Sequence, residues 1–364
     1  MTASNTLLAR TTLGKNLKVR KGESVVIETW THGLPYVGAF VEEARRLGAE
    51  PLVIYEDEGA WWSAVGQGRP KSASAISAAE RAALQSADVF VYFWGPEDRP
   101  RVDALPDKVA GGAFATNPDW YKIGRKAGLR GCRMSVAFAT DPIAKLHGLN
   151  GDRWRTKIAT AGLADAQRMY ATGSHLAKVL EDGSELRIRH RNGTDLTLGL
   201  AKREVRVETG VLDKAAMGRP FGFLTNSPAG TVMTGLDESK ADGTFASNLS
   251  HIQPDLRTPV GRWEFSGGKL VSFQYEGDAE EIAKRFKAAG EGKDRPGLLS
   301  IGLNPKGRGV PMYEEIESGI VLLGIGGNQF LGGRNKLPFQ LFSLLRGADL
   351  EVDGKPVVRA GRVG

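Results

Sequence analysis

The chain has 364 residues, of which 41% are hydrophobic and 25% charged, an ordinary composition for a globular protein of two domains. No apolar run reaches the length of a membrane helix, the N-terminus lacks a secretory signal, and the single cysteine, Cys132, excludes an internal disulfide. The net charge of +7 comes from scattered basic residues without a nucleic-acid-binding motif. We therefore expect a cytoplasmic protein with no membrane or nucleic-acid partner.

The first third of the chain alternates between strand and helix patterns. Apolar, β-branched runs predict strands at 18–29, 50–55 and 87–94, and helical spacing predicts helices at 34–47 and 74–85. Ser77 and Glu80 form a capping box in the second of these helices. This alternation predicts a parallel sheet with right-handed crossovers.

The pattern changes near residue 180. Before it we predict a helix and turn over 119–131, a strand over 134–140 and a helical stretch over 156–180 broken near Gly173. After it, two strands joined at Asn192-Gly193 predict a hairpin, followed by strands at 230–234, 243–246, 262–265 and 270–275 and a helix at 279–289. We therefore predict two domains: an α/β domain over 1–180 with a parallel sheet, and a β-rich α+β domain over 181–364 that carries the pocket.

Glycine is dense between residues 297 and 358, within apolar runs. Glycine at this density indicates backbone packed closely against backbone, or a pocket lined by backbone. We expect the pocket of the second domain to lie over these strands.

Four segments together resemble one superfamily. KVRKGESVVIET near the start, NGTDLTLGL in the hairpin, NSPAG at 226–230 and the stretch 299–353 are similar to the family M29 aminopeptidases. The last stretch is also similar to the 2,5-dihydroxypyridine 5,6-dioxygenases, which are non-haem iron relatives. The resemblance implies the M29 aminopeptidase-like fold, a homodimer and chemistry at a metal centre.

The residues at the positions that the resemblance assigns to metal ligands are poor ligands. These positions hold Thr231, Leu298, Ser300, Leu322, Gln340 and Phe342, and no histidine follows His251. Hydrocarbon side chains cannot coordinate a dication, and neutral oxygens coordinate it weakly. We therefore predict no metal at this place and no cofactor, with Leu322 and Phe342 packed as an apolar wall.

Three residues are candidates for catalysis. His251 is either an acid or base of the pocket or a hydrogen-bonded loop histidine. Glu315 belongs to a cluster with Glu314 and Glu317, which either performs acid–base chemistry when desolvated or forms a solvated loop. Ser300 would need a base to act as a nucleophile, and the sequence offers only His251.

The substrate-binding candidates are Thr231, Gln340, Leu322, Phe342 and Arg334. The first four occupy inferred ligand positions and would face the pocket. Arg334 either holds a substrate carboxylate through two hydrogen bonds or is a turn arginine that points to solvent.

Features of the first domain offer a second candidate region. His32 follows the first strand of the predicted parallel sheet, at the end where ligands bind in open α/β folds, and is either a functional residue or part of the loop structure. Trp61, Trp62 and Trp94 lie near strand ends and either line an aromatic pocket or pack in the core.

Three functional hypotheses follow. The favoured one is a metal-independent hydrolase that binds a small amino-acid-like, peptide or heteroaromatic molecule in the retained cavity. The second is a non-catalytic protein that binds a small molecule or peptide. The third is a metal-dependent aminopeptidase whose ligands the sequence does not reveal.

Overall fold

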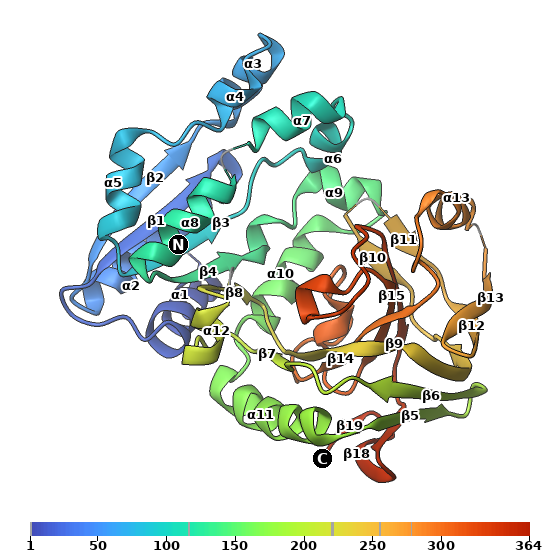
Figure 1. The fold of residues 1–364 in the computed structure, drawn as a ribbon. Helices are drawn as coiled ribbons and strands as arrows, with labels where there is room; N and C mark the ends of the chain where they lie inside the picture. Colours follow the sequence, from blue (N-terminus) through green and yellow to red (C-terminus); the bar gives the residue numbers. More distant parts are fainter. Residues whose placement is uncertain (1, 116, 220–221, 255, 278) are drawn as a thin grey trace. The chain divides into compact units, whose positions relative to one another are not determined.

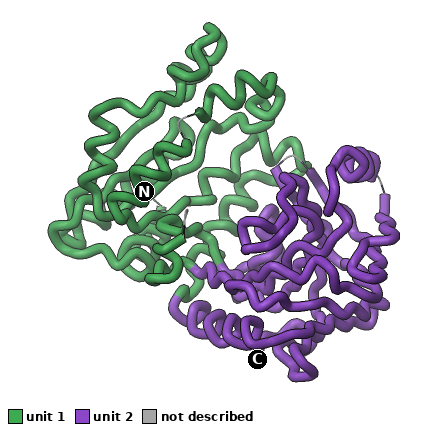
Figure 2. The backbone as a smooth tube through the Cα atoms, in the orientation of Figure 1, with its two compact units in different colours: residues 1–166, 210–229 green, residues 167–209, 230–364 purple. Residues whose placement is uncertain are grey.

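The computed structural model describes residues 2–115, 117–219, 222–254, 256–277 and 279–364. The chain forms two compact units, each built from two segments (Figure 2). Unit 1 comprises Met1–Ala166 and Gly210–Ala229, and unit 2 comprises Gln167–Thr209 and Gly230–Gly364. The boundary predicted after residue 180 falls inside helix α11 (Ala166–Asp182).

Unit 1 contains a parallel five-stranded sheet (Figure 1). In spatial order its strands are β2 (Glu50–Glu56), β1 (Ser24–Trp30), β3 (Val89–Phe93), β4 (Arg130–Met134) and β8 (Leu224–Ser227). The first three were predicted from their apolar runs. The fifth strand, β8, comes from the second segment of the unit, and the sequence analysis predicted no strand there.

Helices cover both faces of this sheet. The helices of unit 1 are α1 (Ala3–Ala9), α2 (Leu34–Arg46), α3 (Glu58–Gly66), α4 (Pro70–Ala73), α5 (Ala78–Ser86), α6 (Arg99–Asp103), α7 (Asp107–Ala113), α8 (Asn117–Ala127), α9 (Asp141–Leu146), α10 (Gly151–Ala161) and α12 (Lys214–Gly218), with the π-helical η1 (Arg10–Asn16) and the 3-10 turns η2 (Thr31–Gly33) and η3 (Ser135–Ala137). Phe40 of α2 packs edge-on against Phe93 on one face. On the other face, Leu84 of α5 and Ile123 of α8 pack with Phe90. The predicted cap is confirmed, because Ser77 Oγ accepts a hydrogen bond from Glu80 N at 3.0 Å.

Two predictions in this part of the chain were wrong. The strand predicted at 134–140 lies earlier, at β4, because parallel pairing with β3 selects Arg130–Met134 in spite of its two arginines. The predicted helix break near Gly173 lies instead between α10 and α11, and Gly173 is inside α11. A Cβ at Gly173 would come within 2.7 Å of Val207 Cγ1, so glycine there permits close packing.

Unit 2 is built around a largely antiparallel sheet. Its main path is β16 (Gln340–Leu345), β15 (Val321–Gly326), β14 (Pro296–Gly302), β9 (Thr231–Ala246), β6 (Thr194–Leu200), β5 (Glu185–His190), β17 (Asp349–Val352), β18 (Lys355–Arg359) and β19 (Arg362–Val363). The remaining elements are β7 (Arg206–Glu208), β10 (His251–Gln253), β11 (Leu256–Thr258), β12 (Gly261–Ser266), β13 (Lys269–Tyr275), α13 (Glu280–Ala288), η4 (Glu314–Ile316) and η5 (Gln329–Leu331). Strand β9 pairs with both β14 and β6 and so belongs to both halves of the sheet.

The predicted fold class is therefore confirmed: a parallel α/β sheet with helices in one unit and an antiparallel β-rich unit. The hairpin at Asn192-Gly193 is present as β5 and β6, with Gly193 at a φ of 91°. The strands predicted at 230–234 and 243–246 are the two ends of the single strand β9. Among the described residues, no helix combines the length and the apolar character needed to cross a bilayer.

Candidate active site

Four adjacent antiparallel strands of unit 2 carry the positions that the sequence resemblance singled out. Residues that pair directly across antiparallel strands point to the same side of a sheet. Ser300 pairs with Leu322 and Met233, Gly324 pairs with Leu298 and Phe342, Thr231 pairs with Gly302, and Gln340 pairs with Gly326. Together with the two-residue alternation along each strand, this register places Thr231, Leu298, Ser300, Leu322, Gln340 and Phe342 on one face.

Apolar side chains cover much of this face. Leu298, Leu322 and Leu344 belong to one buried cluster, and Phe342 packs against it. Thr231 and Ser300 are buried at 6% and 3% exposure, so neither presents its hydroxyl to bulk solvent. Ser300 Oγ has no hydrogen-bond partner in the described part of the chain, so no base contacts it there.

A histidine and two glutamates meet beside this face. His251 Nδ1 lies 3.0 Å from Glu314 Oε2, and both side chains are nearly buried. One ligand-type atom from each of His251, Glu314 and Glu315 lies within 4.8 Å of the others. The His251 ring also packs edge-on against Phe342 at 5.9 Å, which joins this triad to the apolar cluster.

The environment of the triad shifts two of its pKa values. Burial raises the pKa of Glu315 to about 7; the nearby His251 opposes this and the Glu314 carboxylate adds to it. Burial disfavours the charged form of His251, but the hydrogen bond to Glu314 and the charge of Glu315 outweigh it and raise the His251 pKa. Glu315 can therefore exchange a proton near neutral pH. The sequence analysis left open whether this cluster is desolvated or forms a solvated loop, and in the structure Glu314 and Glu317 are both buried at 9% exposure.

The loop between β14 and β15 positions the glutamates. Glu317 accepts two hydrogen bonds from the Arg346 guanidinium, at 2.9 and 2.6 Å, and one from Gly309 N at 3.2 Å. Met312 N donates to Glu314 Oε1 at 3.1 Å. A Cβ at Gly302 would come within 2.0 Å of Glu317 O, so only glycine lets the loop pack this tightly on β14.

The structure brings together His251 and Glu315, which the sequence analysis named as separate catalytic candidates, and it adds Glu314 as the partner of the histidine. The sequence analysis named Glu314 only as a neighbour of Glu315, and no local pattern reveals its contact with a histidine 63 positions away. Gln340 is on the same face of the sheet as Phe342, but it lines a separate small cavity of about 140 Å³, and its Nε2 donates to Gly327 O at 2.6 Å.

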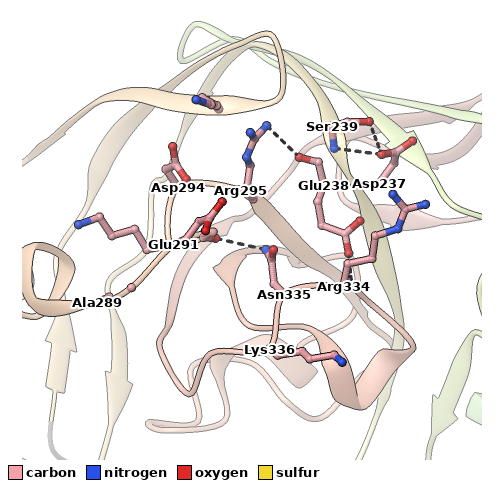
Figure 3. Close-up of a pocket in the computed structure, with 14 residues that line it drawn as sticks. Asp237, Glu238, Ser239, Ala289, Glu291, Asp294, Arg295, Arg334, Asn335 and Lys336 are labelled. Carbon is pink, nitrogen blue, oxygen red and sulfur yellow. Dashed lines mark hydrogen bonds between the residues drawn. The ribbon is translucent and has the colours of Figure 1, made fainter.

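Arg334 lines a different, larger cavity of unit 2, of about 890 Å³ (Figure 3). Its backbone N–H donates to Glu238 Oε1 at 2.7 Å, while its side chain is exposed. Burial opposes ionisation of Glu238, but hydrogen bonds from Arg203, Arg334 N and Asn328 outweigh it and lower its pKa to about 2. Glu238 therefore anchors the loop that carries Arg334.

A second group of possible metal ligands occurs in unit 1, around His32. His32 Nε2 lies 3.0 Å from Ala137 O, and its Nδ1 lies 3.7 Å from Glu58 Oε2. Glu97 completes this cluster of three donor residues. Burial opposes ionisation of Glu58, but its hydrogen bonds prevail and lower its pKa to about 2. Glu58 is thus an anion in a partly buried place.

These observations can be set against known proteins. A model of the M29 peptidase family, described as thermophilic metalloprotease, matches residues 5–305, so the chain belongs to the M29 family.

Two solved structures share the fold. AmpT from Thermus thermophilus is 18% identical with a TM-score of 0.68, covering 99% of this chain and 98% of its own. The 2,5-dihydroxypyridine dioxygenase from Pseudomonas putida KT2440 is 19% identical with a TM-score of 0.64, covering 100% of this chain and 98% of its own. No curated protein matches the chain.

Proposed function

We propose that this chain is a hydrolase of small amide-like or peptide-like molecules, with His251, Glu314 and Glu315 as its acid–base centre. The observation that carries the proposal is the 3.0 Å contact between His251 and Glu314 beside a carboxyl group whose pKa burial raises to about 7. A catalytic acid or base works best when its pKa lies near the working pH. Membership of a peptidase family supports hydrolysis as the reaction class.

In the proposed reaction, a water molecule is the nucleophile. Glu314 orients the His251 ring, and the ionised form of Glu315 accepts a proton as the water oxygen bonds to the substrate carbonyl carbon. The same proton passes to the leaving nitrogen as the carbon–nitrogen bond breaks. Leu322 and Phe342 form an apolar wall for the substrate. Arg334 and Gln340 line other cavities, so Thr231 is the candidate that remains for a polar contact with it.

We also propose that the metal site of the family is lost at the positions inferred from the resemblance. Leu298, Leu322 and Phe342 present hydrocarbon there and pack together. The hydroxyls of Thr231 and Ser300 are neutral, so little offsets the cost of dehydrating a dication at this place.

The test is turnover of aminoacyl amides, dipeptides and hydroxypyridines by the purified protein, with and without a chelator. We expect hydrolysis that survives the chelator and rises with pH through about 7. Glu315→Gln and His251→Asn should each lower the rate by about 10²-fold or more. The matched control Glu276→Gln changes an exposed glutamate of the same unit and should leave the rate unchanged. Binding without turnover would instead identify a non-catalytic binding protein.

A second candidate keeps the reaction but adds a metal at the same three residues. The imidazole nitrogen and two carboxylates lie close enough together to hold one ion, and zinc accepts such a donor set. A bound metal would polarise a carbonyl or activate water. Elemental analysis of protein purified without chelator separates the two. Stoichiometric metal that disappears in the His251→Asn variant, together with activity lost to chelator, would replace the metal-independent proposal.

A further inference from the structure

A cavity of about 410 Å³ lies over one face of the unit 1 sheet, on the side of α5 and α8. Its walls include the aromatic side chains of Trp30, Trp61, Tyr92, Trp94, Phe114 and Trp120. The sequence analysis left open whether Trp61 and Trp94 line a pocket or pack in the core. Both line this cavity, and a wall of flat rings is suited to a planar ligand.

A carboxyl group and a guanidinium occupy the two ends of one row across the sheet. Glu28 of β1 pairs with Tyr92 of β3, and Tyr92 pairs with Arg133 of β4, so all three point to the same face. Neighbouring strands are about 4.8 Å apart, which separates the backbones of Glu28 and Arg133 by roughly 10 Å. The floor of the cavity therefore has an acidic end and a basic end with a phenol ring between them.

The acidic end contains three carboxyl groups. Glu56 of β2 and Glu80 of α5 line the cavity together with Glu28. Burial, and then the charges of Glu80 and Glu56, raise the pKa of Glu28 to about 8, and the Trp120 indole only partly opposes this. Burial also raises the pKa of Glu56 and Glu80. A cation at this end would relieve the repulsion among the three groups.

The basic end presents an arginine that lacks an anion. The Arg133 guanidinium donates to Tyr121 Oη at 3.0 Å and lies 5.6 Å from the Trp94 ring centre. Among the described residues Arg133 forms no ion pair, whereas Arg99, which also lines the cavity, is paired with Asp103 at 2.8 Å. A guanidinium in an aromatic pocket is well suited to bind a carboxylate.

Polar atoms of the walls also lack partners. Glu28 Oε2 and the indole nitrogen of Trp94 are buried and make no hydrogen bond with any described residue. Buried polar atoms are rarely left unpaired in folded proteins. Their concentration around one cavity indicates that an occupant supplies the missing bonds.

We propose that this cavity binds a small aromatic zwitterion, with its ammonium group at Glu28, its carboxylate at Arg133 and its ring among the tryptophans. The site lies wholly in unit 1. It shares no residue with the proposed hydrolytic centre of unit 2, so each proposal can fail without the other.

The experiment compares four probes by isothermal titration calorimetry and tryptophan fluorescence at pH 7. The first probe, 4-(aminomethyl)benzoate, carries both charges and the ring. Benzoate keeps the ring and the carboxylate, and benzylamine keeps the ring and the ammonium. The fourth probe, 6-aminohexanoate, carries both charges without the ring. We expect 4-(aminomethyl)benzoate to bind at least roughly tenfold more tightly than each of the others, because each loses one of three contacts. Its binding should quench tryptophan fluorescence.

Two substitutions test which end of the cavity binds the carboxylate and which binds the ammonium group. Arg133→Gln should weaken 4-(aminomethyl)benzoate but not benzylamine, and Glu28→Gln should weaken 4-(aminomethyl)benzoate but not benzoate. Binding of the ammonium should also release a proton from the acidic end, where Glu56, Glu80 and Tyr92 surround Glu28. This release appears as a dependence of the binding heat on the buffer. The control Arg125→Gln removes an exposed arginine of α8 and should leave all four affinities unchanged.

Three outcomes of these binding measurements would contradict the proposal or one part of it. Absence of binding by all four probes would overturn the proposal. Equal binding of benzoate and 4-(aminomethyl)benzoate would overturn the acidic end, and equal binding of benzylamine would overturn the basic end. Circular dichroism of each variant shows whether a lost affinity reflects lost folding, and the fold of the isosteric Glu28→Gln is expected to persist.

Discussion

Individual side chains of this protein are held in environments that change their chemistry. Glu28 and Glu315 are both carboxyl groups with pKa values raised chiefly by burial, to about 8 and about 7 respectively. One lies in unit 1 and the other in unit 2. The two units thus each contain a carboxyl group that titrates near neutral pH.

Glu28 should make the stability of the protein depend on pH. Its pKa is about 8 in the folded state against an ordinary value of 4.5, so the folded protein retains a proton that the unfolded chain releases. Stability is therefore fully present below about 4.5 and decreases as pH rises toward 8. Glu28→Gln should remove this loss, raising the melting temperature by several degrees at pH 8.5 and hardly at pH 4.5. Thermal unfolding at the two pH values checks it, and an equal shift at both would contradict it.

Ser300 allows the water mechanism to be separated from a serine mechanism. Its buried hydroxyl lacks a hydrogen-bond partner among the described residues, so Ser300→Ala should leave the turnover rate unchanged and stabilise the fold by up to about 1 kcal/mol.

Ser247→Ala is the matched variant, because it removes a buried hydroxyl that does form hydrogen bonds. Ser247 is equally buried, but its hydroxyl donates to Gly261 O at 3.2 Å and accepts from Gly261 N at 2.7 Å. Ser247→Ala should therefore cost about 1–3 kcal/mol in chemical denaturation. A large loss of turnover in folded Ser300→Ala would restore Ser300 as the nucleophile.

At the scale of elements, the four strands β9, β14, β15 and β16 form a sheet whose face is closed by apolar side chains. Leu322 lies within this cluster at 5% exposure. The face is therefore part of the hydrophobic core of unit 2 as well as the neighbour of the His251 triad.

Truncation of Leu322 should show this structural role. Leu322→Ala leaves a cavity in the cluster and should cost about 2–5 kcal/mol of unfolding free energy. Val271→Ala, at a β13 position that is 62% exposed, is the control and should change stability by less than about 0.5 kcal/mol. Urea denaturation measures both. Similar small effects would mean that the cluster packs loosely and leaves room at the inferred ligand positions.

At the scale of the whole molecule, the oligomeric state remains a proposal. We propose a homodimer from the resemblance to M29 aminopeptidases, and most soluble homo-oligomers are twofold dimers. Light scattering coupled to size-exclusion chromatography should then give about 78 kDa, twice the chain mass of 39.2 kDa. A mass that stays at that of one chain across protein concentrations would contradict this.

The sequence by itself determined the local structure. Asn192-Gly193 specified the β5–β6 hairpin because the three-residue loop between His190 and Thr194 needs a positive φ, which Gly193 adopts without strain. Ser77 specified the start of α5 through its cap. Residue type alone also made Leu322 and Phe342 unfit as metal ligands. Each conclusion depends on neighbours in the chain or on the chemistry of one side chain.

Only the tertiary structure decided which distant residues meet. Glu28, Tyr92 and Arg133 form one row because parallel pairing sets the register of three strands, and no local pattern contains that register. The position of β4 was missed for the same reason. The burial of Glu314 and the pairing of His251 with it depend on how the loop between β14 and β15 packs. A pKa is set by burial and nearby charge, and both come from residues far away in the chain.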